Sequence, residues 1–239
     1  MFMTATATRR RAALAFRAAF PLTLPVLAGF LFLGIAYGVL MHGIGVGPGW
    51  TFLTSFLVFA GSMQYVAIAL FTASFNPMYT LAVTLMVNAR HIFYGLSMLD
   101  KVKDAGPFRP YIIFAMCDET FSILCSAQAP EGVDSGFFMF FVALLNRWYW
   151  ILGSVCGALL GNLLTFNTQG LDFTLTALFV VIFLNQWAKR ANRSSSLIGV
   201  GCSLLCLILF GPDGFIIPAM ALMLGVFALS GKKLAGGAA

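Results

Sequence analysis

Charged residues are scarce in this sequence. Only 9% of its 239 residues are Asp, Glu, Lys or Arg, whereas a soluble domain carries roughly one-quarter. Hydrophobic residues make up 60% of the chain, and the mean hydropathy is +0.93. A chain of this composition has too little polar surface for a soluble fold, so we predict an integral membrane protein.

The usual enzyme motifs are also missing. The sequence contains no GxSxG, no P-loop and no HExxH, and its five cysteines show neither CxxC nor Cys/His ligand spacing. We therefore predict a protein that is not an enzyme and that has no metal and no cofactor. The net charge of +6 comes from basic clusters beside apolar runs, so we expect no nucleic-acid partner.

Long apolar runs dominate what remains. Each lasts about 20 residues, the length that spans a bilayer as a helix, and none alternates polar with apolar residues as a β-barrel strand would. We predict an all-α, polytopic transmembrane helix bundle with a basic N-terminal flank at 1–19, one membrane domain over 20–231 and a short tail at 232–239. About eight spans are expected, at 20–41, 51–73, 77–99, 109–129, 136–162, 171–188, 195–211 and 213–230.

Basic residues in short loops indicate the orientation, because such loops stay in the cytoplasm. The arginines within 9–17 place the N-terminus inside, and eight crossings also place the basic residues at 189–193 and 232–233 inside. The same count puts the basic loop at 101–109 outside, against the rule. The alternative is seven spans, with a re-entrant or broken segment among the first three.

Helix breakers occur in the first two predicted spans. The first contains Pro21 and Pro25, and the second contains Gly61, Ser62 and Gln64. Interrupted helices expose backbone groups that many transporters use to bind substrate. For the first span, close packing is an equally good interpretation. For the second, the additional polar side chains favour a place in a transport pathway.

The third predicted span contains a polar cluster of Asn88, Arg90, His91 and Tyr94. On one helix, Arg90 and Tyr94 share a face, as do Asn88 and His91, so the cluster covers about half the circumference. An Arg inside a span costs at least about 2.5 to 3.5 kcal/mol and therefore pairs or lines a pathway. We predict a substrate pathway here; the alternative is that Arg90 snorkels to the nearby end of the span.

The fourth predicted span carries Asp118, Glu119, Thr120 and Ser122 in the middle of an apolar run. Two adjacent carboxylates at this depth need a cation or a proton, and they point about 100° apart on a helix. We predict that this cluster binds substrate and that Asp118, Glu119 or His91 carries protons. The alternative is a structural ion pair between two helices.

Asn146 and Arg147 form a third cluster within 136–162. If this segment is one span, Arg147 lies near its middle and faces the bundle; if the segment is kinked, Arg147 snorkels beside an aromatic belt. Asn88-x-Arg90 and Asn146-Arg147 echo each other, but the match is too short to establish an internal repeat.

Several of these segments together resemble one family. LFLGIAYGVL at 31–40, FLVFAGSMQYVAIALF at 56–71, VNARHIFYGLSM at 87–98 and CDETFSI at 117–123 occur with the order and spacing of the AzlC family of branched-chain amino acid exporters, also called YgaZ-like or BrnF-like. The resemblance implies a secondary transporter in the bacterial plasma membrane, with its N-terminus in the cytoplasm. It also implies a small AzlD-like membrane subunit as partner, and Val, Leu, Ile and, as a further candidate, Met as substrates.

The residues themselves suggest how an amino acid substrate would bind. Arg90 and Asp118 could hold a zwitterion between them, with Phe and Met side chains as apolar walls. Two other classes stay open: a channel or transporter for another small zwitterionic or organic solute, and an intramembrane enzyme. Membrane lipid surrounds the bundle in each case, and a higher oligomer is left open.

Overall fold

The computed structural model describes residues 5–161, 173–188, 193–212 and 214–234. Within these ranges the chain forms helices and no strand, which confirms the predicted all-α class. Two compact units are present, Met1–Thr174 and Leu175–Ala239. This division neither confirms nor contradicts the predicted single membrane domain over 20–231.

Three helices among the described residues are individually long and apolar enough to cross a membrane. They are the Thr8–Gly43 part of α1 (Ala5–Gly43), α8 (Ser135–Leu160) and α10 (Arg193–Phe210). α1 passes through Pro21 and Pro25 without a break. Of the two interpretations left open for the first span, an interrupted helix is therefore wrong, and the basic flank at 1–19 is helical from Ala5 onward.

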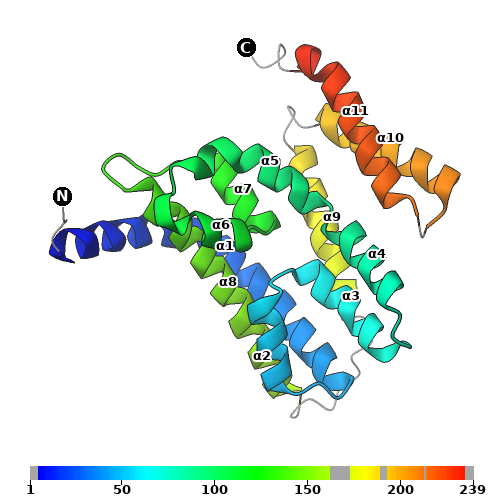
Figure 1. Cartoon of the computed structure of the whole chain (residues 1–239), viewed down its shortest axis with the longest axis horizontal. Helices are drawn as coiled ribbons and strands as arrows, with labels where there is room; N and C mark the ends of the chain where they lie inside the picture. Colours follow the sequence, from blue (N-terminus) through cyan, green and yellow to red (C-terminus); the bar gives the residue numbers. More distant parts are fainter. Residues whose placement is uncertain (1–4, 162–172, 189–192, 213, 235–239) are drawn as a thin grey trace. The chain divides into compact units, whose positions relative to one another are not determined.

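Helices α1 and α8 pack side by side in the first unit (Figure 1). Small residues explain the close approach, since a Cβ added at Gly38 would lie 2.1 Å from the Ser154 carbonyl oxygen and one added at Gly157 would lie 2.1 Å from the Ile35 carbonyl oxygen. Membrane helices associate through such small-residue contacts because water provides no driving force there. Gly34 and Gly38 of the first span therefore serve packing.

The contacts between α1 and α8 show that the two helices are parallel. Arg11 approaches Asp134 at 3.9 Å, and Thr23 Oγ1 lies 3.1 Å from the Tyr149 hydroxyl. At the far ends, a Cβ at Gly161 would meet His42. Parallel spanning helices cross in the same direction, so an odd number of crossings separates them. Eight crossings meet this condition, whereas a seven-span arrangement with the second or third predicted span re-entrant leaves two crossings between them.

Two of the three spans predicted between α1 and α8 are broken. The break near Gly61 is confirmed, and a continuous helix over 109–129 is wrong. The segment 77–99 stays helical, since Ala89 between α4 and α5 has a φ of −53° and a ψ of −32°. The observed pairs are α2 (Pro48–Leu57) with α3 (Gly61–Thr72), α4 (Pro77–Asn88) with α5 (Arg90–Lys103), and α6 (Arg109–Phe114), preceded by the 3-10 turn η1 (Gly106–Phe108), with α7 (Asp118–Ser126).

The first pair folds back on itself. Gln64 Nε2 donates to Ser55 Oγ at 3.0 Å, although the two residues are nine positions apart; along a straight helix, that separation amounts to about 13 Å. Phe59 in the connection has a φ of 43°, a left-handed conformation that costs a non-glycine residue about 1 to 2 kcal/mol. Figure 1 shows α2 and α3 as two arms that meet at this connection.

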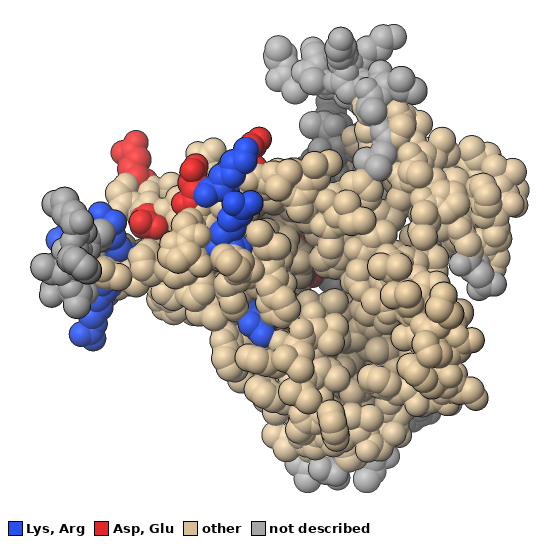
Figure 2. Space-filling view, in the orientation of Figure 1, with Lys and Arg blue, Asp and Glu red and all other residues tan. Residues whose placement is uncertain are grey.

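The α6/α7 pair also returns to the end from which it starts. Lys101, near the end of α5, donates to the carbonyl oxygens of Leu124 and, at 2.8 Å, of Ala127, so the end of α7 lies where α6 begins. Charged side chains gather at this end of the first unit, over the start of α1 and the end of α5 (Figure 2). We call it the charged end.

The second unit contains α10, α11 (Ile216–Leu234) and nearly all of α9 (Phe173–Ala188). These helices correspond to the last three predicted spans. Cys202 and Cys206 of α10 are buried, as is Ala219 of α11, and α10 packs against α11. The remaining parts of the predicted spans at 171–172 and 213 lie outside the described residues, as do 189–192 and the tail from 235.

Candidate functional site

Asp118 and Glu119 occupy the first turn of α7, not the middle of a span as predicted. The helix is interrupted over residues 115–117, directly before them. Carboxylates are favourable at a helix N-terminus because unpaired backbone N–H groups and the helix dipole face them there. The break thus reduces the cost of placing two acids at this depth.

Arg90 is the centre of a charged cluster that joins the three helix pairs. Its Nη1 lies 2.9 Å from Asp118 Oδ2, and its Nη2 donates to Ser62 Oγ at 2.5 Å. The Tyr94 hydroxyl donates to Asp118 Oδ1 at 2.7 Å. Four of the predicted site residues therefore converge, and Arg90 and Tyr94 share a helix face as expected. Arg90 does not snorkel in this structure, because its guanidinium binds the start of α7.

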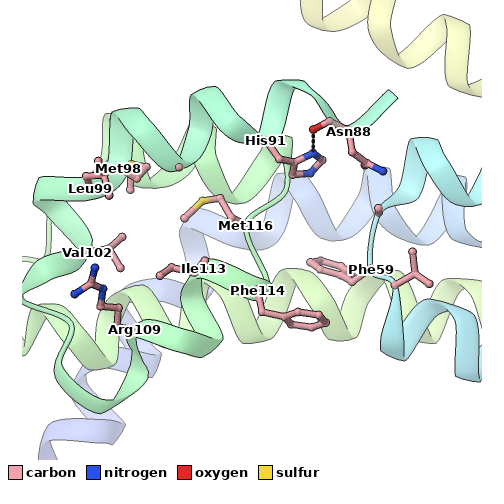
Figure 3. A pocket seen from close by; sticks show the side chains of 13 residues that line it. Phe59, Asn88, His91, Met98, Leu99, Val102, Arg109, Ile113, Phe114 and Met116 are labelled. Atoms are coloured by element: carbon pink, nitrogen blue, oxygen red, sulfur yellow. Dashed lines mark hydrogen bonds between the residues drawn. The ribbon is translucent and has the colours of Figure 1, made fainter. Parts of the chain in front are cut away.

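A cavity of about 470 Å³ lies beside this cluster (Figure 3). Asn88 and His91 form its polar side, and Arg109 lies at its other end, towards the charged end. The remaining walls are apolar: Val58, Phe59, Ala60, Gly95, Met98, Leu99, Val102, Ile113, Phe114 and Met116. The breaks at 58–60 and 115–117 both contribute to the cavity wall, the first through residues 58–60 and the second through Met116. Phe and Met side chains are therefore among its walls.

Asn88 and His91 flank the junction of α4 and α5, where the backbone hydrogen bonds of Ala89 and Ile92 shorten locally to three-residue spacing. Asn88 ends α4 and donates to the Thr84 carbonyl oxygen at 3.0 Å, while His91 Nδ1 lies 3.2 Å from the Asn88 carbonyl oxygen. The His91 ring also packs edge-on against Tyr94. His91 thereby connects the cavity wall to the residue that holds Asp118.

Gln64 and Gly61 lie in a buried aromatic cluster instead of on the cavity wall. Trp150 Nε1 donates to Gln64 Oε1 at 2.8 Å. A Cβ added at Gly61 would lie 3.2 Å from the Trp150 ring. Tyr37 stacks on Trp150, and the Tyr65 hydroxyl donates to the Leu33 carbonyl oxygen. The polar group of Gln64 thus finds its partners in a structural contact between α3 and α8.

Thr120, Asn146 and Arg147 connect α7 and α2 to α8. Asn146 Nδ2 donates to Thr120 Oγ1 at 3.1 Å, and Arg147 donates to the Phe56 carbonyl oxygen near the end of α2. Arg147 is 8% exposed, and its guanidinium lies over the rings of Phe56, Phe114 and Tyr111. α8 is continuous, so Arg147 faces the bundle.

Ser122 and Glu119 complete the predicted set on α7. Ser122 is exposed, and its carbonyl oxygen accepts a hydrogen bond from the Ser126 hydroxyl. Glu119 directly follows Asp118 and is half-buried. Sequence reasoning missed Phe59, Phe114 and Arg109 as cavity residues, because only the fold-back of the broken helices brings them together.

Comparison with known families agrees with this membrane architecture. The chain matches the model of the family described as AzlC protein over residues 25–164, more than half of its length. The chain belongs to the AzlC family. This match contains the charged cluster, the cavity and most of the α1/α8 contact.

Several curated relatives match most of the chain. A Bacillus subtilis (strain 168) protein named branched-chain amino acid transport protein AzlC is 54% identical over 220 residues, covering 92% of this chain and 87% of the relative. Membrane proteins of Haemophilus influenzae and Helicobacter pylori (strain J99) are 44% and 38% identical, covering 85% and 92% of this chain and 84% and 96% of the relatives. No solved structure matches the chain.

Proposed function

We propose that this AzlC-family protein exports branched-chain amino acids across the bacterial plasma membrane. The observation that carries the proposal is the Arg90–Asp118 pair beside an apolar cavity of about 470 Å³. An α-amino acid presents both charges at one end, and Val, Leu and Ile present an apolar side chain at the other. The volume falls within the range typical of small-molecule sites.

The cluster suggests how the amino acid is held. The substrate carboxylate would replace Asp118 on Arg90, and the substrate ammonium would bind the released Asp118, which Tyr94 keeps in place. The apolar side chain would then extend along Met98 and Met116. Because Arg90 and Asp118 are bonded to each other in this structure, binding exchanges one ion pair for two.

The relative from Bacillus subtilis supports the substrate class, since its name assigns it to branched-chain amino acid transport. Export as the direction and a small AzlD-like membrane subunit as the partner belong to our proposal. Asp118, Glu119 and His91 are the proposed proton-coupling residues, because they are the carboxylate and imidazole side chains at or beside the charged cluster.

An efflux experiment tests the export proposal. Cells lacking their own exporters would be loaded with a valine- or leucine-containing dipeptide and would express this chain with and without the small subunit. We expect the free amino acid to leave faster when both are present. Absence of efflux in both cases, with the proteins verified in the membrane, would overturn the proposal.

Substitution of Arg90 tests the assigned site. Arg90→Gln should abolish efflux while the protein stays in the membrane. Lys103→Gln is the matched control, because Lys103 pairs with Asp100 at 2.5 Å on an exposed surface and such pairs contribute about 0 to 1 kcal/mol. Equal efflux from both variants would remove Arg90 from the site.

Proton coupling is tested separately by imposing pH gradients of either sign on the loaded cells. We expect the efflux rate to follow the gradient, and we expect His91→Gln to weaken this response. An efflux rate that ignores the gradient would exclude coupling through these residues without affecting the substrate assignment.

A further inference from the structure

Two stretches of the first unit show the same order of elements. In residues 48–103, α2 and α3 flank a break at 58–60 and are followed by α4 and α5. In residues 106–160, α6 with η1 and α7 flank a break at 115–117 and are followed by α8. The long segments begin alike, because the side chains of the N-caps Asn76 and Asp134 each accept a hydrogen bond from the backbone N–H three residues ahead.

Polar residues occupy equivalent positions in the two stretches. Asn76 corresponds to Asp134, Asn88 to Asn146 and Arg90 to Arg147. Each residue of the first stretch is separated from its counterpart in the second by the same number of positions, to within one residue. The two breaks are separated by that number as well. The Asn-Arg echo is too short to establish a repeat by itself. It becomes significant because the surrounding helices and breaks repeat with it.

The two equivalent arginines make reciprocal contacts. Arg90, from the first stretch, pairs with Asp118, the residue that directly follows the break of the second. Arg147, from the second stretch, donates to the carbonyl oxygen of Phe56, which directly precedes the end of α2 in the first. Each arginine therefore reaches the broken pair of the other stretch, as expected when two copies face each other about a common axis.

The broken pairs enter the unit from opposite ends. The α6/α7 pair starts and finishes at the charged end, where Lys101 binds the end of α7. The α2/α3 pair starts at the other end, since α2 follows the end of α1, and Gln64 turns α3 back beside α2. Copies of opposite orientation are typical of secondary transporters, with the substrate site at their interface.

Charge in the loops supports this arrangement. If α2/α3 and α6/α7 are both re-entrant, only α4/α5 crosses between α1 and α8, which satisfies their parallel packing. The predicted spans then cross six times, and the basic segments 9–17, 101–109, 189–193 and 232–233 all face the cytoplasm. Eight crossings leave 101–109 outside, against the rule that basic loops stay inside.

We propose that residues 48–103 and 106–160 are two inverted copies of one structural unit, whose re-entrant pairs enter the membrane from opposite sides and meet at the substrate cavity. The cavity extends from both breaks towards Arg109 at the charged end, so it faces the cytoplasm. Cytoplasmic loading of the substrate follows if the export function holds, whereas the inverted topology stands without it.

Cysteine accessibility in intact spheroplasts tests the topology. In a background with the five native cysteines replaced by serine, Ser74→Cys and Asp104→Cys would be treated with a membrane-impermeant maleimide before and after permeabilisation. We expect Ser74→Cys to react in intact cells and Asp104→Cys to react only after permeabilisation. Eight plain crossings place these two positions on the opposite sides, so the reverse pattern would overturn the proposal.

Two control positions calibrate the labelling. Gly47→Cys lies outside and Glu131→Cys lies inside under both topologies. Their labelling therefore calibrates the reagent without distinguishing the two topologies. If the cysteine-free background does not reach the membrane, the natural sequence provides Lys103, which is 62% exposed. An impermeant amine reagent, with the modified peptide identified by mass spectrometry, should modify Lys103 only from the inside, and modification in intact cells would overturn the proposal.

A cavity variant tests the side of the opening. Gly95 lines the cavity, and a Cβ there meets nothing within 4 Å, so Gly95→Cys is tolerated sterically. We expect the impermeant maleimide to modify it in inside-out vesicles at least several-fold faster than in intact spheroplasts. Faster reaction from the outer side would contradict a cytoplasm-facing cavity, whether or not the protein exports valine.

Discussion

Arg90 and Arg147 occupy equivalent positions but have different surroundings. Arg90 binds a carboxylate, Asp118, and a hydroxyl, Ser62, beside a cavity. Arg147 is buried among three aromatic rings, binds a backbone carbonyl oxygen, and has no carboxylate within ion-pair distance in the described part of the chain. Arg90 is thus suited to exchange partners with a zwitterion, whereas Arg147 is suited to hold helices in place.

The largest effect is expected from Asp118→Asn. This substitution removes the carboxylate partner that distinguishes Arg90 from Arg147. The side chains of this pair are still 25% and 22% exposed, so its loss costs less than that of a fully buried pair, which is about 3 to 5 kcal/mol. Because Asp118 also binds the substrate ammonium in our proposal, we expect efflux to fall at least tenfold. The measurement is amino acid efflux, normalised to the amount of protein in the membrane. Asp100→Asn, which breaks only an exposed pair, should change efflux less than twofold.

Arg→Lys substitutions at the two sites should differ in kind. Arg147→Lys keeps the charge but loses the planar contact with Phe56 and Phe114, worth about 0.5 to 2 kcal/mol. We expect it to lower the Tm of the purified protein more than Arg90→Lys does, whereas Arg90→Lys lowers efflux more. Equal effects of the two variants on both measurements would remove the distinction.

Tyr94→Phe sharpens the comparison, because it removes the hydroxyl that fixes Asp118 without changing either arginine. A hydrogen bond to a charged group contributes about 1.5 to 3 kcal/mol. Since part of this energy also stabilises the empty site, we expect a several-fold loss of efflux and little change in protein amount. Tyr79→Phe, at an exposed position of α4, is the control and should behave as the natural sequence does.

The smallest effect is expected at Ser122, which sequence reasoning included in the pathway. Ser122→Ala should leave both efflux and Tm unchanged, because the side chain is exposed and apart from the cluster. Thr120→Ala removes the acceptor of Asn146 and should lower stability by about 1 kcal/mol, seen as a lower Tm. A loss of efflux in Ser122→Ala would show that the face of α7 carrying Ser122 belongs to the transport pathway.

The helical class and the charged cluster could be predicted from the sequence. Apolar run length locates the helices, and the cost of burying Arg90 and Asp118 singles them out before their contact is known. The break before Gly61 was also detectable. The break over 115–117 was not, because it contains neither Gly nor Pro.

The cavity could not be derived from periodicity either. Phe59 and Phe114 belong to different broken helices, and only the fold-back of each pair brings them to one wall. Pro21 and Pro25 left two interpretations open, an interrupted helix or close packing. The sequence alone did not decide between them, and the structure shows α1 helical through both prolines.

The glycine contacts between α1 and α8 determine which parts of the protein can move during transport. With Gly34 and Gly38 seated on the backbone of residues 153–158, these two helices cannot slide or tilt against each other without losing their closest packing. They therefore form a fixed frame. Access to the two sides of the membrane must alternate through the short helices around this frame, whose breaks provide natural hinges.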